Sequence, residues 1–216
     1  LNLGYIGYDL DLTPELGYPN TLGGSLNPEQ QWDKSTPAHN TVSFDDLGYM
    51  GHIVGYGKPL HFDATEAVQV IQASSNEVEN SYVLFAKQYE RTAALIRIDD
   101  TDSYYVDFFH VNSSRPYSYN FHTAEIDASN TKYSNVSFSE EPPITFNAKT
   151  LRNVKEASTS GSSFSIDWNV LDTWNCYGHG AHAKTDIHLK LTVLGQFNHI
   201  SLGEAIPPTN VENNPL

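Results

Sequence analysis

The stretch Thr92-Ala-Ala-Leu-Ile-Arg-Ile98, Asp99-Asp-Thr-Asp102, Ser103-Tyr-Tyr-Val-Asp-Phe-Phe-His-Val111 decides the fold class. Two runs rich in aliphatic and aromatic residues flank a short segment dominated by aspartate. Aliphatic and aromatic runs of this length favour strands. Aspartate favours tight turns, because its carboxylate bonds nearby backbone N–H groups. The stretch therefore predicts two neighbouring strands joined by an acidic turn.

Further segments show the period-two alternation that is typical of half-buried strands. They are residues 41–44, which run into Asp45-Asp46, and residues 67–73, 117–122, 164–170, 186–194 and 199–206. Helical signal is nearly absent, since the best candidate, residues 77–94, has irregular apolar spacing. We therefore predict an all-β fold, a large antiparallel multi-stranded β-sandwich over residues 1–206, with a C-terminal tail at 207–216. Residues 20–38, 124–143 and 147–163 are predicted to be long loops.

The composition excludes several classes of protein. The chain has 216 residues, of which 39% are hydrophobic and 18% charged, so it can bury a core. Its formal net charge of −14 opposes nucleic-acid binding, which needs lysine and arginine to neutralise phosphates. A polyanionic ligand would likewise need a basic partner surface outside this chain. No apolar run approaches the ~18 residues of a membrane span, so we predict none.

Three motifs near the N-terminus follow one another in a characteristic order. They are Leu12-Thr-Pro-Glu15-Leu-Gly-Tyr-Pro19, then Trp32, then Thr36-Pro-Ala-His39-Asn-Thr-Val-Ser-Phe-Asp45. This order resembles the heparinase II/III family of polysaccharide lyases, which shows an acidic residue before Leu-Gly-Tyr-Pro, a tryptophan, and then His-Asn-Thr-Val. Segments similar to the family's later strands follow in the same order over most of the chain, at residues 89–96, 104–111, 117–122, 188–195 and 205–208.

The resemblance implies a secreted or periplasmic enzyme that cleaves an acidic, uronate-containing polysaccharide by β-elimination. In this family a β-sandwich follows an N-terminal helical toroid domain, and the active site lies between them. The chain corresponds to the sandwich, and Leu1-Asn-Leu3 corresponds to the stretch just after a His-Gly-His-type motif. We therefore expect the catalytic residues outside this chain, and no lyase activity from the chain alone.

The resemblance also implies a structural zinc site. In the family the metal is held by a histidine of the upstream motif, the acidic residue before Leu-Gly-Tyr-Pro and the histidine of His-Asn-Thr. In this sequence the last two positions are Glu15 and His39, whose carboxylate oxygen and imidazole nitrogen suit zinc. Glu15 departs from the family's usual aspartate by one methylene group. The alternative is that Glu15 is a surface acid and that His39 bonds a turn.

Two further residues are candidates for contact with the polysaccharide. His122 ends an alternating strand, and Trp32 lies in the loop that leads to His39, where its ring is able to stack on a sugar. The alternatives are a packed strand histidine and a core tryptophan. His179 and His182, followed by His188, resemble metal ligands by composition, but their Gly-rich surroundings favour a solvated loop.

A second class of function stays open at this point, a non-catalytic carbohydrate-binding or cell-surface β-sandwich module. The order of the Glu15 and His39 motifs discriminates the two classes, because a binding module has no reason to show it. The residues encoded upstream of Leu1 discriminate them further, since the lyase interpretation requires a helical region there.

Overall fold

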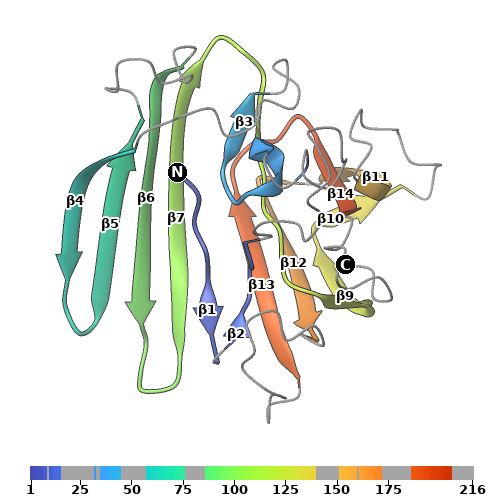
Figure 1. Cartoon of the computed structure of the whole chain (residues 1–216). Coiled ribbons are helices and arrows are strands. Elements are labelled where there is room, and N and C mark those ends of the chain that lie inside the picture. Colours follow the sequence, from blue (N-terminus) through green and yellow to red (C-terminus); the bar gives the residue numbers. More distant parts are fainter. Residues whose placement is uncertain are drawn as a thin grey trace, which may run out of the picture. The chain divides into compact units, whose positions relative to one another are not determined.

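The computed structural model describes residues 1–8, 10–15, 32, 35–44, 57–75, 86–139, 151–159, 161–171 and 186–205. The chain divides into two compact units that interleave in sequence. Unit 1 contains residues 1–3 and 34–121, and unit 2 contains residues 4–33 and 122–216. Figure 1 shows strands of both units, and all but β8 carry a label.

The largest sheet of unit 1 has four antiparallel strands in chain order, β4-β5-β6-β7 (Figure 1). Their bounds are β4 (Lys58–Ala64), β5 (Val68–Ser74), β6 (Ala86–Arg97) and β7 (Ser103–Ser113). The β6–β7 hairpin pairs Arg97 with Ser103 and Ala93 with Asp107. Its turn is held by Asp99, whose carboxylate accepts hydrogen bonds of 2.8 Å from the backbone N–H groups two and three residues later. The predicted acidic turn is therefore confirmed.

Both faces of this four-stranded sheet carry exposed apolar side chains. Phe108 of β7 is 55% exposed, and Ile71 of β5 is 48% exposed. The register places Phe108 opposite Thr92 and Ile71 opposite Ala93. Because successive residues of a strand point to opposite faces, Phe108 and Ile71 lie on different faces of the sheet.

A two-stranded sheet packs on the four-stranded one and forms the core of unit 1. It pairs β3 (Val42–Phe44) with β8 (Tyr117–Tyr119), and the 3-10 turn η1 (Thr36–Ala38) precedes β3. Val42 and Phe44 pack against Tyr89 of β6. The ring of Tyr89 meets that of Phe109 edge to face, with 4.9 Å between the centroids. The buried part of unit 1 therefore lies where β3 covers β6 and β7.

The described residues of unit 2 form three small antiparallel sheets, with the strand orders β1-β2, β13-β12-β9 and β10-β11-β14. The bounds are β1 (Ile6–Gly7), β2 (Leu10–Asp11), β9 (Ile126–Ser134), β10 (Val136–Phe138), β11 (Leu151–Thr159), β12 (Ser163–Val170), β13 (Ile187–Leu194) and β14 (Ile200–Ala205).

Strand β12 organises the core of unit 2 through a regular alternation. The apolar side chains of Phe164, Ile166, Trp168 and Val170 are all buried. Val170 packs with Leu10, Ala124 and Ile187 in one cluster. The residues between these apolar positions point to the other face, which is polar.

The all-β prediction is confirmed. Apart from η1, each element with described bounds is a strand, and each pair of strands is antiparallel. The eight predicted strands are present with shifted ends; the one predicted at 92–98 starts at Ala86, and the one predicted at 117–122 ends at Tyr119. The packing of all sheets into one sandwich domain over residues 1–206 stays a prediction. Asp45-Asp46 and the tail at 207–216 lie outside the described residues.

The predicted loops at 124–143 and 147–163 are wrong in part, because they contain β9, β10 and the whole of β11. Strand β9 escaped prediction because its register breaks. It pairs with β12 at Asp127 and again at Lys132, and the residues between bulge out of the ladder. Such a bulge interrupts the period-two alternation on which the prediction rested. Strand β4 was missed as well, since all of its residues are exposed and it contains Pro59.

Candidate functional site

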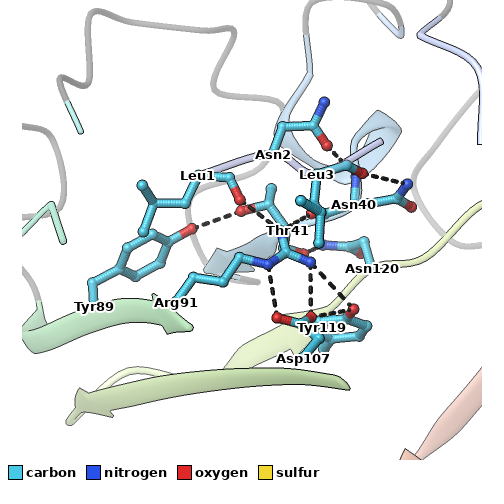
Figure 2. A network of polar contacts seen from close by, with 10 residues as sticks. All are labelled: Leu1, Asn2, Leu3, Asn40, Thr41, Tyr89, Arg91, Asp107, Tyr119 and Asn120. Carbon is cyan, nitrogen blue, oxygen red and sulfur yellow. Dashed lines mark hydrogen bonds and ion pairs between the residues drawn. The ribbon is translucent and has the colours of Figure 1, made fainter. Parts of the chain in front are cut away.

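The guanidinium group of Arg91 lies at the centre of a buried polar network in unit 1 (Figure 2). Nε and one terminal nitrogen bond the two carboxylate oxygens of Asp107 at 2.9 and 2.8 Å. The other terminal nitrogen donates to the backbone carbonyls of Leu1 and Asn40. A longer contact of 3.5 Å reaches the hydroxyl of Tyr119. These bonds engage all five N–H donors of the guanidinium group.

Asn40 links the N-terminal segment to the residues that precede β3. It is 1% exposed. Its backbone N–H donates to the side chain of Asn2 at 2.9 Å, and its side-chain amide donates to the carbonyl of Leu3 at 3.0 Å. On the other side, the carbonyl of Thr41 accepts from the backbone N–H of Asn120 at 2.8 Å. The network thus joins segments that are far apart in the sequence (Figure 2).

Tyr89 anchors β6 to β3 through its hydroxyl. This hydroxyl donates to the carbonyl of Val42 at 2.6 Å, and the hydroxyl of Thr41 lies 3.1 Å from the hydroxyl of Tyr89. Burial raises the pKa of Tyr89 above its ordinary value, while the bond to Thr41 and the charge of Arg91 oppose that shift. Tyr89 therefore stays neutral and acts as a donor at physiological pH.

The network has a structural role rather than a role in binding an anion. A buried arginine can grip a carboxylate ligand only with donors that are not already used. Every donor of Arg91 is engaged, and its charge is balanced by Asp107, which is 13% exposed. Arg91 therefore fixes the positions of the chain segments around it, His39 included.

His39 directly follows η1 and is held in this framework. Its side chain is 6% exposed. Its backbone N–H donates to the carbonyl of Thr36 at 3.1 Å, and its own carbonyl accepts from Thr41 at 2.8 Å. The structure thus fixes the backbone of the predicted ligand on both sides.

Unit 2 brings His122 beside the segment that contains Glu15. Nε2 of His122 lies 3.0 Å from the carbonyl oxygen of Pro14, the residue just before Glu15. Because a carbonyl only accepts, His122 donates here from Nε2. Glu15 is exposed and His122 is half-buried. Two of the four predicted site residues therefore come from neighbouring segments of one unit.

Trp32 belongs to unit 2 and is buried, with 6% of its surface exposed. This burial is what the interpretation as a core tryptophan predicts. A ring that stacks on a sugar needs an accessible face, and this burial gives no support for such a contact. Contact between Trp32 and a sugar stays a prediction. His179 and His182 lie outside the described residues.

A zinc site is not complete within the described part of the chain. No group of three or more histidine, cysteine, aspartate or glutamate residues there is placed to hold a metal ion. Glu15 belongs to unit 2 and His39 to unit 1. The described residues thus do not fit a zinc ion by themselves, and the zinc site stays a prediction that depends on further ligands.

The sequence did not predict the pairing of Arg91 with Asp107, although the signal was available. Once the turn at Asp99 sets the hairpin register, Asp107 lies opposite Ala93. Arg91 is two residues from Ala93 and therefore lies on the same face of the sheet.

Comparison with protein-family models, with curated proteins and with solved structures finds no match to the chain. Within the described residues, no helix has the length and apolar character needed to cross a membrane.

Proposed function

We propose that the chain is the β-sandwich portion of a polysaccharide lyase that cleaves uronate-containing polysaccharide by β-elimination. One observation supports this above others: segments that carry the resemblance also meet in one buried network. Leu1 to Leu3, Asn40, Arg91, Asp107 and Tyr119 come from five separate segments and are joined by hydrogen bonds (Figure 2). The segments that carry the resemblance therefore hold one common framework.

In the proposed reaction, a base removes the proton at C5 of the uronate and an acid protonates the departing glycosidic oxygen. The uronate carboxylate must be neutralised for that proton to become acidic. Arg91 is not available for this task, and the net charge of −14 opposes it. The basic and catalytic groups are therefore assigned to a helical toroid domain of the same parent protein, with His122 as a contact from this chain.

The proposal is tested by comparing the polypeptide encoded by the complete reading frame with the 216-residue chain alone. Each is mixed with heparan sulfate, alginate and other uronate polysaccharides, and the absorbance of unsaturated uronate is followed. We expect absorbance to rise with the complete polypeptide and not with the chain alone. A complete polypeptide without a helical region, or one that releases no unsaturated product from any uronate, would refute the proposal.

Variants of the complete polypeptide assign the residues. We expect Glu15→Ala and His39→Ala to lower its bound zinc, measured by elemental analysis. Asp63→Ala, which changes an exposed acid on β4, is the matched control and leaves zinc unchanged. Zinc that stays equal in all three variants would remove Glu15 and His39 from the metal site.

A carbohydrate-binding module without catalysis is the second candidate, and the exposed aromatic residues of β7 favour it. Tyr104 and Phe108 lie on the same face of the sheet and are 48% and 55% exposed. Exposed aromatic groups on a flat sheet are able to stack on sugar rings. Affinity electrophoresis in polysaccharide gels tests it: retardation that is lost in Phe108→Ser, with no product formed by the complete polypeptide, would favour this function.

A further inference from the structure

A histidine in unit 2 lies between two carboxylates that approach its two ring nitrogens separately. Nδ1 of His188 is 2.8 Å from Oδ1 of Asp167, and Nε2 is 3.0 Å from Oδ1 of Asp186. Asp167 belongs to β12 and His188 to β13, while Asp186 immediately precedes β13. Because the two nitrogens face different partners, this is not a set of ligands that converges on a metal ion.

This geometry requires two N–H donors on one imidazole ring. An ionised carboxylate only accepts hydrogen bonds, so each ring nitrogen must carry a proton to satisfy both. A neutral imidazole has one N–H group and would turn a lone pair toward the second carboxylate. The arrangement is therefore that of the imidazolium form.

Asn169 is a third neighbour of His188, and it can bond the imidazole in its neutral form. Nδ2 of Asn169, which pairs with His188 across β12 and β13, lies 3.4 Å from Nε2. The amide group is a donor, so it can bond Nε2 only when that nitrogen has lost its proton. Asn169 also lies 3.5 Å from the carbonyl of Ile187, which accepts from the same amide in the protonated state.

We propose that His188 is a pH-sensitive clamp that holds Asp167 and Asp186 together when protonated, and exchanges Asp186 for Asn169 when it loses the proton. The bond from Nδ1 to Asp167 persists in both states. The residue released is Asp186, whose backbone has a φ of +69°. That conformation is unfavourable for a residue with a side chain, so the bond to His188 helps to maintain it.

The charges around the clamp set the direction of its response. The bond to Asp167, then that to Asp186, raises the pKa of His188 above its ordinary value of 6.5, and partial burial opposes this. Asp127 of β9 lies in the same row as Asn169 and His188, and Lys132 and Lys190 flank Asp167 on the two neighbouring strands.

The experiment uses heteronuclear NMR of the ring nitrogens of His188 in the 216-residue chain across the neutral pH range. We expect both nitrogens protonated at low pH and only Nδ1 protonated at high pH. The backbone amide shifts of Asp186 and Ile187 should follow the same midpoint and lose that response in His188→Gln. A neutral form protonated at Nε2 would overturn the proposal.

Two variants are expected to shift the pKa of His188 in opposite directions, which a merely structural contact would not do, and a third variant is the control. Asp186→Asn lowers the pKa of His188, whereas Asn169→Ala raises it, because only the neutral form loses a partner. Asp63→Asn, the same exchange on exposed β4, leaves the pKa unchanged. Resonances of β12 and β13 verify that each variant is folded. Equal midpoints in Asp186→Asn and Asp63→Asn would refute the clamp.

Discussion

The two units each hold a cation between acceptor oxygens, and the two cations behave differently because of burial and chemistry. Arg91 in unit 1 is 5% exposed, and its five donors reach a carboxylate, a hydroxyl and two backbone carbonyls. His188 in unit 2 is 29% exposed and bonds two carboxylates, that of Asp167 on the neighbouring strand β12 and that of Asp186 just before β13. Arginine keeps its proton at all relevant pH values, whereas histidine loses it near neutrality. The first cluster therefore fixes a fold, and the second responds to pH.

The largest loss of stability is expected when the buried cation, Arg91, is removed. In Arg91→Met, Asp107 is left as an uncompensated and nearly buried charge, and two backbone carbonyls lose a donor. We expect the free energy of unfolding to fall by about 3–5 kcal/mol, which is the usual cost of breaking a buried ion pair. Urea denaturation followed by far-UV circular dichroism measures the loss.

The double variant Arg91→Met with Asp107→Leu is the control for this prediction. It replaces both charges by apolar groups and is expected to be more stable than Arg91→Met alone. If the double variant is the less stable of the two, the loss in Arg91→Met comes from the backbone carbonyls and not from the stranded carboxylate.

Part of this buried network was predictable from the sequence. The alternation in residues 92–111 and the acidic turn define the β6–β7 hairpin, and the hairpin register then brings Arg91 and Asp107 to one face. What local patterns cannot provide is the convergence of Leu1 and Asn40 on Arg91. These contacts span 90 and 51 residues, and such long-range pairing depends on the packing of the whole unit.

The cluster of His188 was harder to predict for a related reason. Strands β12 and β13 are separated by a segment that gives no tight-turn signal, so the pairing of Asn169 with His188 does not follow from the sequence. The bulge in β9 hides the third strand of that sheet. The candidate zinc ligands show a different limit: the motifs single out Glu15 and His39, but the described residues do not complete a metal site around them, so the zinc site stays a prediction.

A smaller effect is expected at Tyr89, which belongs to the buried cluster but carries no charge. Tyr89→Phe leaves the carbonyl of Val42 buried without its donor, at a cost of about 1–3 kcal/mol. The variant also differs from the unchanged chain in how its stability depends on pH in the alkaline range. The folded pKa lies above the ordinary value of 10.0. The stabilisation by the neutral hydroxyl is therefore complete below pH 10 and is lost as the pH rises through the folded pKa.

The stability of Tyr89→Phe should therefore decline less steeply above pH 10 than that of the unchanged chain. Tyr133→Phe is the control, because Tyr133 is 44% exposed. It should alter the alkaline slope less. Equal slopes for the unchanged chain and Tyr89→Phe would show that Tyr89 is not the residue that titrates.

His188, which is partly exposed, should contribute less to stability than either buried residue, Arg91 or Tyr89. His188→Gln is expected to lower the free energy of unfolding by a few tenths of a kcal/mol, because solvent screens a pair at the surface. The folded pKa is raised, so this contribution is fully present below pH 6.5 and is lost as the pH rises through the folded pKa. Denaturation of both chains at pH 5.5 and pH 8.5 measures it. A difference that grows toward pH 8.5 would contradict the prediction.

The smallest effects are expected at the acidic turn of unit 1 and at the bulge of β9 in unit 2, where an aspartate carboxylate bonds its own neighbours. Asp99 accepts from the backbone of Thr101, and Asp127 accepts from Ser129. These bonds hold the pKa of both aspartates below the ordinary value of 3.8. Their stabilisation is therefore present above pH 3.8 and is lost as the pH falls through the folded pKa.

Carboxyl titration by NMR should place both pKa values below the ordinary value of 3.8. Asp99→Asn keeps an acceptor oxygen and should preserve the turn, whereas Asp99→Ala should not. Because Asp99 and Asp127 both accept bonds from the residue two positions later, Asp127→Asn in unit 2 should respond as Asp99→Asn does in unit 1. A much larger response in one unit would show that its aspartate has partners beyond its own sequence neighbours, as Asp107 and Asp167 do. Equal responses would show that the Arg91 and His188 clusters behave differently because of their burial and long-range partners, and not because they belong to different units.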